Sequence, residues 1–70
     1  MLTVALDVTG GDRAPEAPVQ GAASAVRADD DLEVHLIGEP TRVRAVLASL
    51  DPDRSARERL HVIEAREQIA

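Results

Sequence analysis

Three short apolar segments, separated by two amphipathic ones, constrain the fold of this chain more than any other feature. Each apolar segment has the length of a strand and contains β-branched residues: 2–8, 32–37 and 60–65. Because strands that alternate with helices form parallel sheets through right-handed crossovers, we expect an α/β fold. The order β-α-β-α-β is that of the start of a parallel, doubly wound, Rossmann-like three-layer sandwich. We expect the strand at 2–8 to be buried.

The two segments between the strands each carry an apolar stripe at helical spacing. The first helix is expected at 15–28, and Pro40 marks the start of the second. The stripes consist of Val19, Ala22, Ala23 and Val26 in the first helix and Val43, Val46, Leu47 and Leu50 in the second. Gly21 lies beside the first stripe, and we explain it by close packing of the helix on the sheet. The charged segment 51–59 predicts an exposed connection.

The composition offers few means to stabilise a fold of this size. The chain has 70 residues, no cysteine and no aromatic residue, so its core must consist of smaller aliphatic side chains. Two helices also cover a three-stranded parallel sheet poorly, since such sheets are normally covered on both faces. We therefore expect residues 1–70 to be the N-terminal part of a single larger α/β domain, truncated after the third strand.

Charge and hydropathy exclude several classes of function. The net charge is −5, which disfavours nucleic-acid binding because phosphate neutralisation needs a basic surface. No apolar run reaches the roughly 18 residues that a membrane span needs, and the N-terminus lacks the basic start of a signal peptide. We expect a cytoplasmic protein.

The stretch ALDVTGGDRAP, residues 5–15, is the strongest candidate for a functional site. Gly10 and Gly11 stand between Asp7 and Asp12 where the first strand leads into the first helix. Ligands of open parallel sheets bind beyond the carboxyl ends of the strands, and a helix N-terminus there favours an anion such as phosphate. A glycine turn with Asp12 as helix cap explains the same residues. The local pattern supports both interpretations equally.

The charges around the glycines limit what this turn binds. Two carboxylates repel a phosphate, and Arg13 is the only basic residue in the motif. We interpret Asp12 as a residue that organises the loop and leave the role of Asp7 open. Two aspartates are too few to indicate a metal, so we expect no metal site. The candidate phosphate- or substrate-binding residues are Gly10, Gly11, Asp12, Arg13 and Asp7.

The remaining polar residues give weaker signals. GxGxxG and GxxxxGK[ST] are both absent, so Glu39 after the second strand is a poor candidate for a ribose-binding acid. His35 and His61 lie within predicted strands between apolar neighbours. Because neither lies at a carboxyl end, we expect both histidines to be structural.

The motif and its surroundings closely resemble the N-terminus of the bacterial phosphate acyltransferase family, the acyl-carrier-protein–phosphate acyltransferases of phospholipid synthesis. That family opens with a strand that ends in Asp-x-Met-Gly-Gly-Asp, followed by a proline and by a glycine-alanine pair in the first helix. LEVHLIGEPTRV and RLHVIEAREQI resemble its second and third strands. The matching motif positions are Asp7, Gly10, Gly11, Asp12, Pro15, Gly21 and Ala22. Thr9 departs from the family, which has methionine there, so packing around the loop is expected to differ.

The resemblance implies an activity for the full-length protein. Inorganic phosphate attacks the thioester of a long-chain acyl-carrier protein and yields acyl phosphate, without a cofactor. The loop amides at 10–12 would supply part of a phosphate pocket. The resemblance also implies a homodimer that works peripherally at the membrane surface. Two alternatives stay open: a truncated, non-catalytic remnant, and another α/β enzyme that uses phosphate or a nucleotide.

Overall fold

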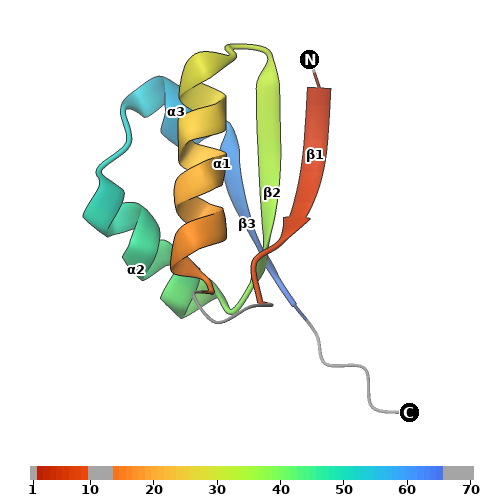
Figure 1. Ribbon diagram of the computed structural model, residues 1–70, viewed down its shortest axis with the longest axis vertical. Helices are drawn as coiled ribbons and strands as arrows, with labels where there is room; N and C mark the ends of the chain where they lie inside the picture. The colour runs from red at the N-terminus through yellow and green to blue at the C-terminus, as the bar shows by residue number, and fades with distance from the viewer. Residues whose placement is uncertain (1, 10–13, 66–70) are drawn as a thin grey trace.

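The computed structural model describes residues 2–9 and 14–65, which form three strands and three helices (Figure 1). The predicted β-α-β-α-β order is confirmed, with one additional short helix before the last strand. The elements are β1 (Leu2–Asp7), α1 (Glu16–Ala28), β2 (Leu32–Gly38), α2 (Pro40–Leu50), α3 (Arg54–Glu58) and β3 (Leu60–Glu64).

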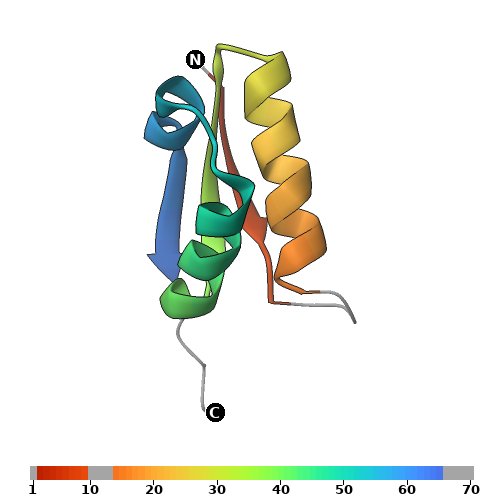
Figure 2. The same cartoon turned by 90° about the vertical axis from the view of Figure 1, so that its left-hand side faces the viewer.

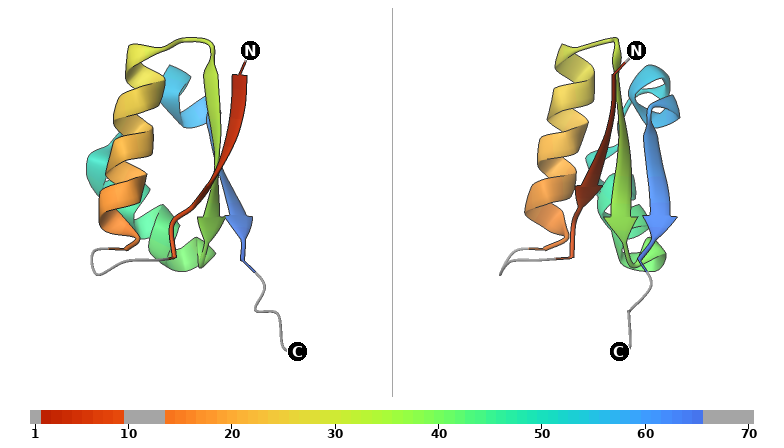
Figure 3. Two further views of the ribbon diagram at one scale, coloured as in Figure 1. Left: turned by 45° about the vertical axis from the view of Figure 1, so that its right-hand side comes forward. Right: turned by 90° about the vertical axis from the view of Figure 1, so that its right-hand side faces the viewer.

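The three strands form one parallel sheet in the order β1-β2-β3. Both crossovers therefore add a strand in the same direction. Since each crossover is right-handed, both must place their helices on the same face of the sheet. Figures 2 and 3 show this arrangement: the helices stand on one side, and the opposite face of the strands is bare. The described residues thus build two layers of the predicted sandwich.

The core lies between the helices and the face of the sheet toward them. In β2 the buried residues alternate with half-buried ones, and Val34 and Leu36 point to the helices. The predicted stripe of α1 is fully buried, whereas α2 contributes Val43 with its other apolar residues packed around it. The buried hydrophobic residues are Val8, Val19, Ala22, Ala23, Val26, Val34, Leu36, Val43, Ala56 and Leu60.

The prediction that strand β1 is buried is wrong for the described residues. Leu2 is 60% exposed and Val4 is 40% exposed. β1 stands at an edge of the sheet. The register partners Leu32 and Val34 place Leu2 and Val4 on the helix-facing side, where a hollow lined by Val4 stays open between β1 and α1. The apolar character of the segment marked a strand correctly but did not reveal what covers it.

The segment 51–59 is more ordered than its charge suggests. Asp53 caps α3 by accepting a hydrogen bond from the Ala56 N–H at 2.8 Å, and Pro52 and Ala56 are buried. The prediction of a wholly exposed connection is therefore wrong. The cap and one small apolar residue suffice to dock a single helical turn.

Arg59 joins three elements at the amino end of the sheet. Its guanidinium donates hydrogen bonds to the backbone oxygens of Asp29 at 2.7 Å, Leu32 at 3.0 Å and Ser55 at 3.2 Å. These carbonyls belong to the end of α1, the start of β2 and α3. The Asp29 oxygen also accepts a hydrogen bond from the Leu32 N–H, so Arg59 reinforces the turn between α1 and β2 and ties it to α3.

Gly21 has a different environment from the one that the sequence suggested. A Cβ atom built on Gly21 meets no heavy atom within 4 Å, and the residue is exposed. Close packing of α1 on the sheet therefore does not explain this glycine.

Among the described residues, none of the helices has the length and apolar character needed to cross a membrane.

Candidate functional site

The chain turns sharply at the carboxyl end of β1, and Asp7 organises that turn. Its Oδ1 atom accepts hydrogen bonds from the Thr9 N–H at 2.8 Å and from the Thr9 hydroxyl. These bonds, first the hydroxyl and then the amide, lower the pKa of the Asp7 carboxyl below its ordinary value. Thr9 thus uses its hydroxyl to hold the turn.

A small pocket opens beside this turn at the carboxyl edge of the sheet. It lies between the end of β1 and the starts of α1 and α2, and its volume is about 80 Å³. About 10–15 Å³ of such space is enough for one water molecule, so the pocket has room for several waters or one small ion. The pocket formed by these residues therefore suits a small ion better than a nucleotide. Its lining residues are Val8, Thr9, Ala14, Pro15, Glu39 and Arg42.

Arg42 supplies the positive charge of the pocket. It lies in the first turn of α2, and no described carboxylate stands within ion-pairing distance of its guanidinium. Arg42 lies outside the 5–15 motif, so the sequence motif did not indicate it. The signal was available: the loops that follow neighbouring parallel strands meet at one edge, which places the start of α2 beside the end of β1.

Glu39 has a structural task in the same pocket. Its carboxylate accepts a hydrogen bond from the Thr41 N–H at 3.1 Å and so caps α2. By contrast, no described side chain caps α1 at Pro15. The pocket thus meets the start of α1, where no described side chain forms a cap, and the start of α2, which Glu39 caps. An anion in it would gain from the dipole of α1.

The other predicted site residues are only partly placed. Asp7 adjoins the pocket through Thr9, and its hydrogen bonds favour the loop-organising role that the sequence left open. The remaining candidates, Gly10, Gly11, Asp12 and Arg13, lie outside the described residues. Their contribution to anion binding stays a prediction, and so does the capping role of Asp12.

Comparison with known proteins assigns the chain to a family. A family model described as "Fatty acid synthesis protein" matches residues 2–70. The chain belongs to this family. The resemblance seen in the 5–15 motif and the later strands is thereby confirmed at the level of the family.

Several relatives in the fatty acid synthesis protein family carry the name phosphate acyltransferase. The protein of Halalkalibacterium halodurans is 41% identical over 68 residues, which is 97% of this chain and 18% of that protein. The protein of Thermus thermophilus is 50% identical over 52 residues, 74% of this chain and 15% of that protein. A relative from Streptococcus equi subsp. zooepidemicus is 41% identical over 51 residues, 73% of this chain and 15% of that protein. The chain spans less than a fifth of the length of these relatives.

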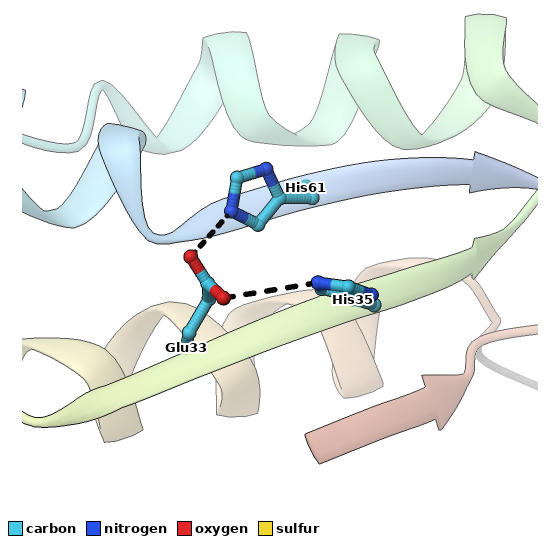
Figure 4. A group of neighbouring side chains, drawn as sticks. All are labelled: Glu33, His35 and His61. Atoms are coloured by element: carbon cyan, nitrogen blue, oxygen red, sulfur yellow. Dashed lines mark hydrogen bonds and ion pairs between the residues drawn. The ribbon is translucent and has the colours of Figure 1, made fainter. Parts of the chain in front are cut away.

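This member of the family also has a polar cluster on the bare face of its sheet. His35 and His61 lie within β2 and β3, away from the carboxyl ends, as predicted. The structure adds what the sequence did not show: both rings converge on the carboxylate of Glu33 (Figure 4). The cluster lies on the other face of the sheet from the helices.

Proposed function

We propose that the intact protein is a phosphate acyltransferase that converts the thioester of an acyl-carrier protein and inorganic phosphate into acyl phosphate. Membership of the fatty acid synthesis protein family and the names of the relatives support this proposal. The structural observation that carries it is the small pocket beside Thr9, which Arg42 helps to line. As part of the same proposal, the protein is a cytoplasmic homodimer that works beside the membrane.

The proposed reaction needs a phosphate that is held without being neutralised. A phosphate oxygen attacks the carbonyl carbon of the thioester, a C–O bond forms, the C–S bond breaks, and the carrier thiolate leaves and takes up a proton. Arg42 offers a planar pair of donors that matches two phosphate oxygens. Two of the four phosphate oxygens would then remain free, and one of them could attack. The start of α1 adds N–H donors, which lower the cost of bringing the anion out of water.

The size of the pocket favours phosphate over the nucleotide alternative. Pockets that hold drug-sized ligands usually enclose about 300–1,000 Å³. The space beside Arg42 is about 80 Å³, and the glycine signatures of nucleotide loops are absent. Isothermal titration of the intact protein with phosphate, ATP and NAD separates the two ideas, since tight binding of ATP or NAD would contradict the acyltransferase proposal.

Substitution of Arg42 tests the proposed role of the pocket. Loss of charged hydrogen bonds of about 1.5–3 kcal/mol lowers kcat/KM for phosphate about 10- to 100-fold in Arg42→Gln. The measurement is the phosphate-dependent release of free carrier thiol from acyl-carrier protein by the intact enzyme. Arg44→Gln is the matched control, because Arg44 lies on the same helix but lines a different hollow. An Arg42→Gln enzyme with the native phosphate dependence would refute the assignment.

A further inference from the structure

We infer that Glu33, His35 and His61 form a binding site for one divalent transition-metal ion, with Zn²⁺ as the ion that fits the donor set. The site lies on the sheet face opposite the helices, whereas the Arg42 pocket lies at the carboxyl edge. The inference is independent of the proposed function, because it concerns metal binding and not acyl transfer.

The backbone brings the three side chains together. Glu33 and His35 are two residues apart in β2, so they point to the same face. His61 of β3 is the direct register partner of His35. Potential ligand atoms of all three residues lie within 4.8 Å of one another, and Figure 4 shows both rings beside the carboxylate. Paired strands fix these positions more rigidly than loops do.

The distances leave room for an ion after small side-chain rotations. His61 Nε2 lies 2.8 Å from Glu33 Oε2, and His35 Nε2 lies 3.9 Å from Glu33 Oε1. Ligands about 2.0–2.1 Å from a tetrahedral zinc ion stand about 3.3 Å from each other. The two observed separations fall on either side of this value. One ion could therefore contact both imidazoles and the carboxylate without a change in the backbone.

A hydrogen-bonded cluster without metal accounts for only part of this arrangement. The short His61–Glu33 contact is a hydrogen bond, but 3.9 Å is too long for one between His35 and the same carboxylate. The two rings also meet edge to face, with centroids 5.1 Å apart. His35 thus faces a carboxylate and an imidazole that it does not bond. A metal ion would give His35 a partner.

The chemistry of the donors selects the class of metal. Two imidazole nitrogens with one carboxylate suit zinc and similar transition metals, whereas Mg²⁺ and Ca²⁺ prefer oxygen ligands throughout. A carboxylate is already deprotonated at neutral pH, which is the form that metal binding needs. Within the part of the chain that the structure describes, the three side chains are 24–42% exposed, so an ion can reach them. A fourth position stays open to water.

Metal titration of the intact protein, freed of metal by chelation, tests the site. Zn²⁺ binding is measured by isothermal titration about one pH unit above the ordinary imidazole pKa of about 6.5. Each of the substitutions His35→Gln, His61→Gln and Glu33→Gln should abolish the one zinc site per chain or lower its zinc affinity at least about 100-fold. Loss of a residue that only hydrogen-bonds to a metal ligand already lowers metal affinity about 10- to 100-fold. Glu64→Gln is the control: it removes the same charge from β3 but lies on the helix-facing side of the strand.

Two results would overturn the inference. The first is a native protein whose Zn²⁺ titration is unchanged by all three substitutions. The second comes from a Co²⁺ titration of the native protein. It is the absence of visible d–d bands of four- or five-coordinate Co²⁺ that depend on Glu33, His35 and His61. Glu33→Gln keeps a hydrogen-bond acceptor for His61, and circular dichroism verifies that this variant is folded. A folded Glu33→Gln protein with native zinc affinity therefore counts directly against the site.

Discussion

A methyl group added at Gly38 should destabilise the protein, because this glycine lets the end of β2 approach two core side chains. A Cβ atom at Gly38 would lie 2.8 Å from Val8 Cγ2 and 3.1 Å from Val43 Cγ2. Carbon atoms normally approach to about 3.5–4.0 Å, so the Val8 methyl must withdraw by at least about 0.7 Å. Val8 and Val43 are 1% and 0% exposed, and valine is stiff about χ1.

The backbone around Gly38 has little freedom to absorb this displacement. The Gly38 carbonyl accepts a hydrogen bond from the Ala65 N–H, and the Val8 N–H donates to Ile37, each at 2.9 Å. Overpacking of a tight core costs about 1–3 kcal/mol. Replacing glycine by alanine also reduces the conformational freedom of the unfolded chain, which stabilises the folded protein by about 0.4–1 kcal/mol. We therefore expect Gly38→Ala to lower the free energy of unfolding by about 0.5–2 kcal/mol.

Gly21 provides a matched control with the opposite expected sign. The same substitution in α1 adds a methyl group to open space and removes a helix-interior glycine, so Gly21→Ala should stabilise by about 1 kcal/mol. Urea denaturation followed by circular dichroism measures both changes as shifts in midpoint at constant slope. A Gly38→Ala protein as stable as the native one, beside a stabilised Gly21→Ala protein, would refute the packing argument.

Two further predictions concern Arg59 and the turn after β1. Replacing Arg59 by methionine removes the charged donor from three backbone carbonyls and should lower the free energy of unfolding by about 1–3 kcal/mol in denaturation experiments. The control is Arg54→Met: the Arg54 side chain is 94% exposed, so this substitution should change stability by less than about 0.5 kcal/mol. Equal effects would contradict the bridging role. The hydrogen bonds from Thr9 lower the pKa of Asp7 in the folded state. The stabilisation of the turn by these bonds is therefore complete above the ordinary carboxyl pKa of about 3.9, and it is lost as the pH falls through the lowered pKa. NMR titration of the Asp7 carboxyl should show a higher pKa in Thr9→Val but not in Thr9→Ser; an unchanged value in Thr9→Val would show that the hydroxyl is not the cause.

Local patterns were sufficient to predict the three strands and the two long helices. The stripe from Val19 to Val26 and the proline at position 40 located the two long helices, because helical spacing and helix starts depend on neighbouring residues. The short helix around Ala56 escaped prediction because one buried alanine among charged residues leaves no periodic pattern. The exposure of β1 also could not be predicted, since a strand sequence does not state what packs on it.

The candidate sites depend on register and proximity, which local patterns do not contain. Arg42 joins the turn at Thr9 only because the starts of α1 and α2 meet at one edge of the sheet. Alternation within β2 places Glu33 and His35 on one face, but the pairing of His35 with His61 required the offset between β2 and β3. Both sites therefore came from residues that are distant in sequence.

The one-sided arrangement of the helices has a consequence for the end of β1. Any further strand that pairs with the free edge of β1 would make β1 an interior strand, and the direction in which strands are added would reverse there. In open parallel sheets such a reversal is a topological switch point, where the loops on either side diverge and leave a crevice. Thr9 and the Arg42 pocket would then form one wall of that crevice. The opposite wall would come from the connection that carries the added strand.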